Sequence, residues 1–428
     1  MRIPMLAALL ACATFCGPQK KTQTPTPAGQ APAPEPAPIP APTPVPQPAP
    51  APTPTPEPTP PVSKFVKAEG TQLVLEGKPF TFTGSNFYRL GLLDDRHTET
   101  QVYEIAEKYA ATDVKVLRIW GFNCGYSDQK LISGFKKGKP VYNERAFRRL
   151  DLAVDAAAKN GLKLILPLIN FNGEYCSMST FTRGIIGNQD TQLFYSDPRV
   201  RAAFKDYVKT VLNRVNTLTK VAYKDEPALM AIELSNEAHT EDWYEKNRGI
   251  KSGELVYQWA ADMSTYVKSI DQNHLVTIGD EGYKAHPSSA DEAAQYQWMS
   301  NGSKGVDFER NIALPNIDLA TVHFYPSAWQ IPRRDFAWLK DNVLKDRARI
   351  AHAARKPVLM EEVGVSTYTN QQLGWASDPA AYFKDVYSAT AEFGYVGNLA
   401  WQLVPDGNYE DGDYIFTFSS PAGQAILR

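Results

Sequence analysis

Short apolar runs alternate with amphipathic stretches along residues 64–428 of the chain. Each run is nearly continuous in apolar residues and only a few residues long, which is typical of strands buried on both faces of a parallel sheet. The predicted strands are 80–88, 114–122, 162–171, 228–237, 274–282, 317–325, 356–364 and 396–403. The predicted helices are 99–111, 145–160, 199–218, 254–270, 335–354 and 378–393. Eight strands that alternate with helices over about 365 residues predict an α/β fold, the (β/α)8 TIM barrel.

Two connections in this pattern are longer than a barrel needs. Residues 172–197 follow the third predicted strand, and residues 283–311 lie between the fifth and the sixth. Long loops at this position of a barrel usually carry function or form binding subsites. The sequence therefore predicts a barrel with enlarged βα loops.

The first residues of the chain have the pattern of an export signal. Residues 3–15 are apolar and small and follow a single Arg2, so 1–16 is interpreted as a signal segment. The run Leu9-Leu10-Ala11-Cys12 resembles a bacterial lipobox, in which a lipid is attached to the cysteine. We therefore expect an exported protein anchored through Cys12 to a bacterial membrane or cell surface. The alternative is a conventional signal and a secreted protein.

A proline-rich segment separates this signal from the rest of the chain. Of the 33 prolines in the sequence, 18 lie in residues 25–61, with alanine, threonine and glutamine between them. Such a segment has no apolar surface to bury, so 17–63 is predicted to be a disordered linker with polyproline-II character. At about 3.1 Å per residue the proline-rich part could extend roughly 110 Å. Residues 64–428 would then form one catalytic domain on a long spacer.

The charge balance limits the partners of this domain. The formal net charge is −2 and the sequence has no long run of lysine and arginine, which argues against nucleic acid and strongly anionic substrates. Eight tryptophans and 21 tyrosines are consistent with a protein that stacks rings on neutral sugars, although most such rings belong to cores.

Two cysteines fall in the predicted domain. Cys124 and Cys176 have no spacing that would suggest a metal site. They follow the second and third predicted strands, which would be neighbours in a barrel. A disulfide between them is therefore a hypothesis for an exported protein.

Polar residues gather at the carboxyl ends of the predicted strands, where barrel enzymes have their active sites. Glu237 and Glu362 each come directly after a short apolar run, although a helix cap or a solvated turn would explain either one alone. Hydrolysis of a glycosidic bond needs one carboxylic acid that protonates the leaving oxygen and one carboxylate that attacks the sugar. The other polar or aromatic residues at strand ends are Arg118, Asn236, His323, Tyr325 and Trp401. Arginine and tyrosine could hold the nucleophile ionised, asparagine could bind a sugar hydroxyl, and tryptophan could stack under a sugar ring.

The chain resembles glycoside hydrolase family 5, and within it the endo-β-1,4-mannanase branch. The resemblance covers nearly all of residues 64–428. It is carried by GSNFYRL (84–90), VLRIWGFN (116–123), FYSDP through LSNE (194–237), IGDEGY (278–283), GVDFERN through HFYPSAW (305–329), KPVLMEEVG (356–364) and AWQL (400–403).

This resemblance implies a retaining mechanism with defined roles for the two glutamates. Glu237 matches the acid/base of the family, and Glu362 matches its nucleophile, two residues before Gly364. We expect a raised pKa for Glu237, an ionised Glu362, and carboxyl groups about 5–5.5 Å apart. Glu361 should point the other way because neighbouring side chains of a strand alternate. The remaining residues implied in substrate binding or support are Arg118, Asn236, His323, Tyr325, Trp401, Trp120 and His239.

Trp401 precedes a cis peptide bond in this family, so the Trp401–Gln402 bond is also expected to be cis.

The sequence departs from the mannanase pattern in three places. Ala238 and His239 follow Glu237 where the branch usually has Pro-Arg, and that arginine helps to bind sugar on the leaving-group side. The stretch INFNGEYCSM (169–178) differs from the usual Asn-Asn-Trp phrase, and Arg89 stands where an aromatic residue is commoner. The missing arginine concerns the leaving-group subsites, and none of the three changes is expected to contact either glutamate.

The function expected from these observations is that of an endo-β-1,4-mannanase acting on mannan, glucomannan or galactomannan. The expected protein needs no cofactor or metal, is a monomer and does not bind nucleic acid. Exo-acting β-mannosidase and β-1,4-glucanase are the alternatives within the enzyme class. The alternative outside it is a surface lipoprotein that binds glycans on an inactive barrel.

Overall fold

The computed structural model describes residues 63–93, 96–368, 371–407, 409–410 and 412–428. The signal segment 1–16 and all but the last residue of the 17–63 linker lie outside the described residues. Among the described residues, no helix has both the length and the apolar character that a membrane span requires.

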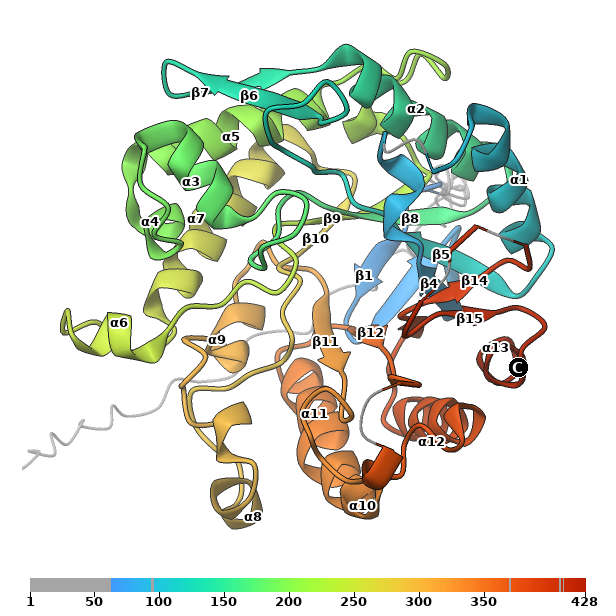
Figure 1. Ribbon diagram of the computed structural model, residues 1–428. Helices are drawn as coiled ribbons and strands as arrows, with labels where there is room; N and C mark the ends of the chain where they lie inside the picture. Colours follow the sequence, from blue (N-terminus) through green and yellow to red (C-terminus); the bar gives the residue numbers. More distant parts are fainter. Residues whose placement is uncertain (1–62, 94–95, 369–370, 408, 411) are drawn as a thin grey trace, which may run out of the picture. The chain divides into compact units, whose positions relative to one another are not determined.

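Eight parallel strands form one sheet in the described part of the chain, with helices around it (Figure 1). The order of neighbours is β10-β9-β8-β5-β4-β13-β12-β11, so consecutive barrel strands lie side by side. The outermost two are bridged by backbone contacts such as Asp318 N to Val276 O, 2.8 Å. The strands are β4 Phe82–Asn86, β5 Val114–Arg118, β8 Lys163–Pro167, β9 Leu229–Glu233, β10 Leu275–Thr277, β11 Ala320–Phe324, β12 Val358–Val363 and β13 Gly397–Ala400. Each falls inside a predicted strand, which confirms the (β/α)8 barrel.

The helices begin where polar side chains cap the first turn. Thr98 and Gln101 form a reciprocal capping box at α1, and Asp197 and Asp378 each cap a helix that starts with proline. The helices are α1 Glu99–Ala110, α2 Glu144–Lys159, α3 Met178–Ile186, α4 Gln192–Ser196, α5 Pro198–Leu212, α6 Asp242–Lys246, α7 Glu254–Ile270, α8 Ala290–Ala294, α9 Phe308–Ile312, α10 Phe336–Leu339, α11 Asp346–Ala353, α12 Pro379–Glu392 and α13 Pro421–Ile426.

Two predicted helices differ from the observed ones. The helix predicted over 199–218 ends at Leu212, and beyond it the buried Asn216 accepts hydrogen bonds from Leu218 N and Thr219 N, which hold the following residues in a turn instead of a helix. The helix predicted over 335–354 is interrupted by a π-helical segment, Lys340–Lys345. The long connections 172–197 and 283–311 are not plain loops either, because they contain α3 with α4 and α8 with α9, respectively.

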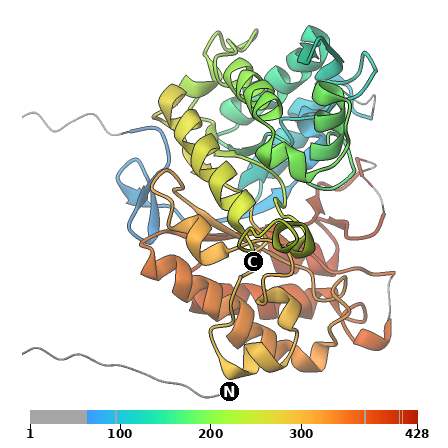
Figure 2. The same ribbon diagram turned by 90° about the vertical axis from the view of Figure 1, so that its left-hand side faces the viewer.

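Small strands outside the barrel were not predicted. They are β1 Lys67–Glu69, β2 Gln72–Leu75, β3 Lys78–Pro79, β6 Ile132–Lys136, β7 Lys139–Tyr142, β14 Leu403–Val404 and β15 Phe416–Thr417. The β1–β3 sheet is blue at the left of Figure 2, and its Leu73, together with Val66 just before β1, belongs to one buried cluster with apolar barrel residues such as Phe82 and Leu359. This sheet therefore lies at the amino ends of the barrel strands, and the polar side chains of the predicted site lie at the carboxyl ends.

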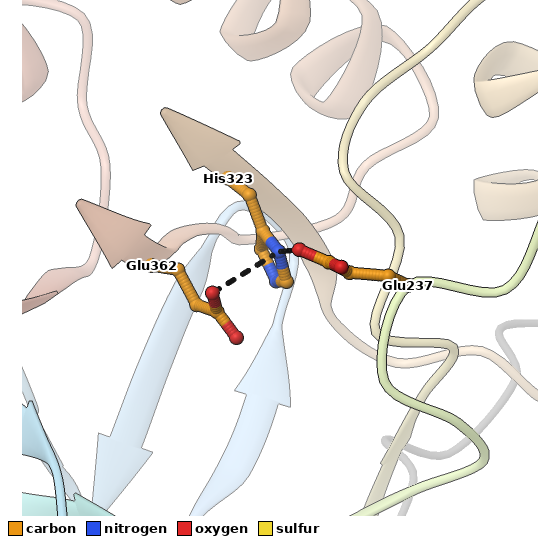
Figure 3. Close-up of side chains that lie close together, drawn as sticks. All are labelled: Glu237, His323 and Glu362. Atoms are coloured by element: carbon orange, nitrogen blue, oxygen red, sulfur yellow. Dashed lines mark hydrogen bonds and ion pairs between the residues drawn. The ribbon is translucent and has the colours of Figure 1, made fainter. Parts of the chain in front are cut away.

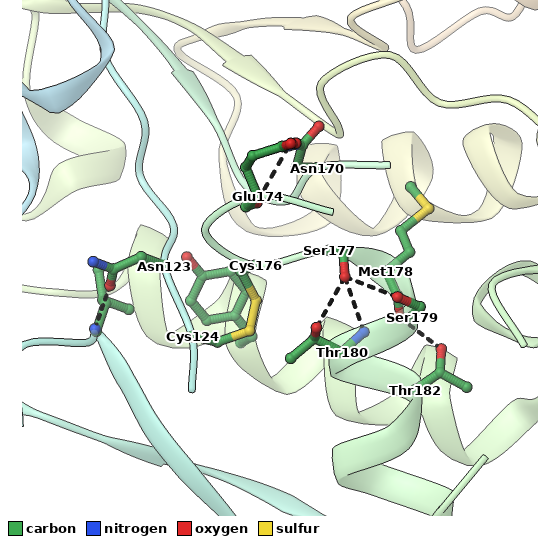
Figure 4. Close-up of a disulfide and its surroundings, with 12 residues drawn as sticks. Asn123, Cys124, Asn170, Glu174, Cys176, Ser177, Met178, Ser179, Thr180 and Thr182 are labelled. Carbon is green, nitrogen blue, oxygen red and sulfur yellow. Dashed lines mark hydrogen bonds between the residues drawn. A yellow bond between two sulfur atoms is a disulfide. The ribbon is translucent and has the colours of Figure 1, made fainter. Parts of the chain in front are cut away.

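The predicted disulfide between Cys124 and Cys176 is confirmed. The two sulfurs are bonded, and Figure 4 shows the bridge between the segment after β5 and the segment after β8. Cys124 N also donates to Tyr175 O at 2.9 Å, so the two segments are joined by backbone as well as by sulfur.

Removing this bridge should lower the stability of the domain. The cysteines are 52 residues apart, and a crosslink of that span restricts the unfolded chain, so replacing both with serine should lower the free energy of unfolding by about 2–4 kcal/mol. Denaturant titrations of the oxidised protein and the double-serine variant measure the difference. Equal transition midpoints and slopes would contradict the expectation.

Candidate active site

The carboxyl ends of the barrel strands surround a cavity of about 480 Å³. Both predicted catalytic glutamates reach it. The side chains and backbone that line it belong to Tyr88, Trp120, Asn170, Asn172, Gly173, Glu174, Tyr175, Asn236, Glu237, Tyr325, Ala328, Glu362, Trp401 and Tyr414. Most of the predicted site residues are therefore on one wall or another of the same cavity.

Arg118 is the last residue of β5 and lies, fully buried, beneath the cavity. Its Nη1 donates to Glu362 Oε1 at 2.5 Å, which is the predicted contact with the nucleophile candidate. Its Nε and Nη2 donate to the two oxygens of Glu233 at 2.7 and 2.6 Å. The same guanidinium donates to Asn236 Oδ1 at 2.6 Å and so orients that amide as well.

Glu362 lies within β12 and has a hydrogen-bond donor on each oxygen. Besides Arg118, the hydroxyl of Tyr325 donates to Glu362 Oε2 at 2.6 Å. Gly364 makes this packing possible, because a Cβ at this position would lie 2.6 Å from the Tyr325 ring and 2.9 Å from Trp401 O. The missing side chain of Gly364 therefore leaves room for the Tyr325 ring, whose hydroxyl holds the carboxylate of Glu362.

The expectation that Glu361 points away from the site is wrong. Its Oε2 lies 3.4 Å from His323 Nε2, and its Oε1 lies 3.9 Å from Arg118 Nε. The reason is an irregular register: β11 and β12 pair regularly up to Val322, after which His323 is opposite Glu362 and Glu361 is skipped. Such a bulge breaks the alternation of side chains and brings both glutamates towards the same cations.

His323 lies between the two candidate catalytic carboxylates (Figure 3). Its Nδ1 is 2.8 Å from Glu237 Oε1 and 3.6 Å from Glu362 Oε2. An oxygen of each glutamate lies within 4.8 Å of the other, which fits the close pair of a retaining enzyme better than the wide pair of an inverting one.

The same three residues offer atoms at a spacing that a metal ion could share. Both ring nitrogens of His323, however, face carboxylates, Nδ1 towards Glu237 and Nε2 towards Glu361. An imidazole that donates from both nitrogens is cationic and has no free lone pair for a metal. Glu237, His323 and Glu362 are therefore better suited to share and transfer a proton than to bind a metal ion.

The electrostatics of this group differ from expectation. Burial raises the pKa of Glu237, but the hydrogen bond from His323 and the nearby charges of His323, His239 and Arg118 outweigh it, so the net pKa is lowered. Burial raises the pKa of Glu362, and the charges of His323 and Arg118 offset this only in part. The expected raised pKa of Glu237 is thus wrong for the protein without substrate.

The raised pKa of His323 explains why the pKa of Glu237 is lowered and not raised as expected. Burial alone would lower it, but the charge of Glu362 and the hydrogen bonds to Glu237 and Glu361 raise it well above its ordinary value. The proton expected on the acid is therefore held by the imidazole, one hydrogen bond away from Glu237.

Aromatic rings form one side of the cavity. Trp401 and Tyr88 are parallel with ring centroids 5.4 Å apart, and Trp120 packs against Tyr88 at 4.7 Å. The Trp401–Gln402 peptide bond is cis, as expected. Trp120 and Trp401 thus lie where sugar-binding residues were predicted.

Two of the departures from the mannanase pattern have clear positions. Arg89 lies over the rings of Tyr88 and Tyr175, 5.1 and 5.4 Å from their centroids, and pairs with Glu410 at 3.5 Å. His239 is not on the cavity wall. It lies behind Glu237, with Nδ1 3.1 Å from the Glu237 carbonyl oxygen.

Several residues of the site were missed by sequence reasoning. Glu233 offered a signal, because a charge inside the apolar run of β9 needs a buried partner, which is Arg118. Tyr88 lay within a quoted motif but had no assigned role. Asn172, whose Nδ2 donates to Glu237 Oε2 at 2.5 Å, gave no signal in the periodicity.

The buried acid Asp280 should make the stability of the folded protein depend on pH. Asp280 accepts hydrogen bonds from Gly282 N at 2.8 Å and Asn311 Nδ2 at 3.1 Å, and burial raises its pKa to about 7. Between its unfolded pKa of about 4 and about 7, the folded protein keeps a proton that the unfolded chain has released, so raising the pH should lower stability across this window. Asp280→Asn should flatten that slope in denaturant titrations. The same slope in both proteins would contradict the assignment.

Comparisons with known proteins agree with this geometry. The family model described as GH family 5 beta-mannosidase-like matches residues 63–400. Mannan endo-1,4-beta-mannosidase 1 of Oryza sativa subsp. japonica is 34% identical over 383 residues, covering 85% of this chain and 84% of the relative. An endo-1,4-beta-mannanase structure from Rhizomucor miehei has a TM-score of 0.70 at 29% identity, covering 85% and 97% of the two chains.

A hyperthermostable endo-1,4-beta-D-mannanase from Thermotoga petrophila RKU-1 has a TM-score of 0.68 at 30% identity, covering 81% of this chain and 98% of the other. With the family match over most of the chain and the paired carboxylates at the strand ends, the chain belongs to glycoside hydrolase family 5 and is a glycoside hydrolase.

Proposed function

We propose that the protein is an endo-β-1,4-mannanase that cleaves internal bonds of mannan, glucomannan or galactomannan by a retaining double displacement. The observation that carries the proposal is the Glu237–Glu362 pair, with oxygens within 4.8 Å of each other in a cavity bounded by Trp401. The names of the rice, Rhizomucor and Thermotoga proteins support mannan as the substrate.

In the first step, a Glu362 oxygen attacks the anomeric carbon of the bound sugar. The bond from that carbon to the leaving oxygen breaks, and Glu237 gives its proton to this oxygen. Arg118 and Tyr325 hold Glu362 for the attack through hydrogen bonds of 2.5 and 2.6 Å. In the second step, Glu237 takes a proton from water as the water attacks the same carbon, and Glu362 is released.

The proton for the first step comes from the network around His323. A bound sugar excludes water from the cavity and so raises the pKa of Glu237, and the imidazole proton lies one hydrogen bond of 2.8 Å away. Once the sugar ester has formed, Glu362 has no negative charge, which lowers the pKa of Glu237 and suits its second role as a base.

Product analysis tests the substrate and the mode of cleavage. Purified protein is incubated with mannan, glucomannan and cellulose side by side, and with mannohexaose. We expect short mannooligosaccharides from mannan and glucomannan and internal cleavage of the mannohexaose. Mannose released alone from one end would support an exo-β-mannosidase, faster cleavage of cellulose a glucanase, and binding without turnover a glycan-binding protein.

We also propose that the protein is exported, anchored by a lipid on Cys12, and active as a monomer. The apolar residues 3–15 and the lipobox-like run before Cys12 support export and anchoring. Fractionation of cells that express the wild type and Cys12→Ser, together with the intact mass of the mature protein, tests the anchor. A mature wild-type protein without a lipid would contradict the anchor. Light scattering of the purified protein tests separately whether it is a monomer.

A further inference from the structure

A short loop after β8 reaches over the acid/base candidate. Residues 170–177 are called the β8 loop below, and they form most of the connection between the end of β8 at Pro167 and the start of α3 at Met178 (Figure 4). It carries Asn172, whose Nδ2 donates to Glu237 Oε2 at 2.5 Å. His323 contacts the other oxygen, Oε1, so the two oxygens of Glu237 are held from two different elements, the β8 loop and β11.

The β8 loop is tied down along its length. At its base, Asn170 N donates to Cys176 O at 3.2 Å and Met178 N to Asn170 O at 2.8 Å. Inside it, Asn172 N donates to Asn170 Oδ1 at 3.1 Å. The disulfide from Cys176 to Cys124 joins it to the segment after β5. The amide of Asn172 is therefore presented by a fixed backbone.

Glu237 needs such support because its own backbone is unusual. Its φ of 52° lies in the left-handed region, which is unfavourable for a non-glycine residue and persists only where the surroundings hold it. Glu237 N donates to Gly279 O at 2.9 Å, and His239 Nδ1 contacts the Glu237 carbonyl oxygen. These contacts fix the backbone, while Asn172 and His323 fix the carboxylate.

Two departures from the mannanase pattern meet at this point. The Phe171 ring, in the β8 loop, packs on the His239 ring with centroids 3.6 Å apart. Phe171 N also donates to Asn236 O at 3.0 Å. The changed stretch 169–178 and the changed residues after Glu237 are thus parts of one contact surface around the acid/base, so the expectation that these changes contact neither glutamate is wrong.

We infer that Asn172 is a positioning residue for Glu237, acting through its amide on the carboxylate oxygen that His323 does not hold. The inference rests on the proposed function and assigns a residue that the mannanase pattern does not supply. An amide donor stabilises the ionised carboxylate and fixes its direction. Asn172 thus supports Glu237 both as a correctly aimed acid and as the base of the second step.

The test compares Asn172→Ala and Asn172→Asp with the wild type on two substrates. Mannohexaose needs a proton on its leaving oxygen, whereas 2,4-dinitrophenyl β-mannobioside does not. For Asn172→Ala, kcat/KM on mannohexaose should fall about 10-fold, while kcat/KM on the aryl substrate stays within about 2-fold. Asn213→Ala, at the exposed end of α5, is the matched control and should behave as the wild type.

The pH profile adds a readout that a general loss of structure would not move. Removing the donor raises the pKa of Glu237, and an aspartate at the same position raises it further, so the basic limb of kcat/KM should move to higher pH in the order wild type, Asn172→Ala, Asn172→Asp. An unchanged limb together with equal losses on both substrates would overturn the inference. Wild-type protein that fails to cleave mannohexaose would instead overturn the proposed function.

Discussion

Replacing Glu362 with glutamine should lower kcat on mannan by about 10⁴-fold or more. The amide has nearly the same shape, but it is uncharged and too weak a nucleophile to form the sugar ester. Arg118 and Tyr325, which contact the carboxylate at 2.5 and 2.6 Å, would still surround it, so the domain should stay folded. Initial rates of reducing-sugar release, with thermal melting as the check on folding, measure the effect.

The neighbouring glutamate provides the comparison for this variant. Glu361 is equally buried and contacts the same Arg118 and His323, but it does not line the cavity. Glu361→Gln should therefore lose far less activity than Glu362→Gln. Equal losses in the two variants, or a larger loss for Glu361→Gln, would contradict the assignment of Glu362 as the nucleophile.

Replacing Glu237 with alanine should lower kcat on mannan by about 10²–10⁴-fold. The loss has two parts, because the leaving oxygen is no longer protonated and water is no longer activated. A substrate with a good leaving group avoids the first part, so kcat/KM on 2,4-dinitrophenyl β-mannobioside should change little.

Azide tests the second part of this loss. It is a nucleophile that needs no general base, and the shortened side chain leaves space for it beside the ester on Glu362. Adding azide to Glu237→Ala should therefore restore turnover of the aryl substrate and give a β-mannobiosyl azide, which mass spectrometry and NMR identify. Equal losses on both substrates without azide rescue would contradict the acid/base role.

The barrel could be predicted from the sequence because its signal is local and repeated. Each of the eight strands is a short apolar run, and a parallel sheet with helices on its outside requires that pattern. Both glutamates could be placed at strand ends for the same reason. The small strands outside the barrel, such as β3 with its two residues, are too short to give a periodic signal.

The contacts around the glutamates could not be predicted in the same way. The irregular register that brings Glu361 towards His323 depends on the pairing of β11 with β12, which no single segment encodes. The lowered pKa of Glu237 depends on His323 and Arg118, which are distant in sequence and close only in the barrel. The hydrogen bond from Asn172 to Glu237 likewise depends on the path of the β8 loop.

The most direct test of the account follows the anomeric configuration of the first product by ¹H NMR during cleavage of mannohexaose. A close pair with Glu362 as nucleophile and Glu237 as acid/base inverts the anomeric carbon twice. The new reducing end should therefore appear first as the β-anomer and turn into the α-anomer only by mutarotation. Initial release of the α-anomer would mean a single displacement and would contradict the roles assigned to the two glutamates.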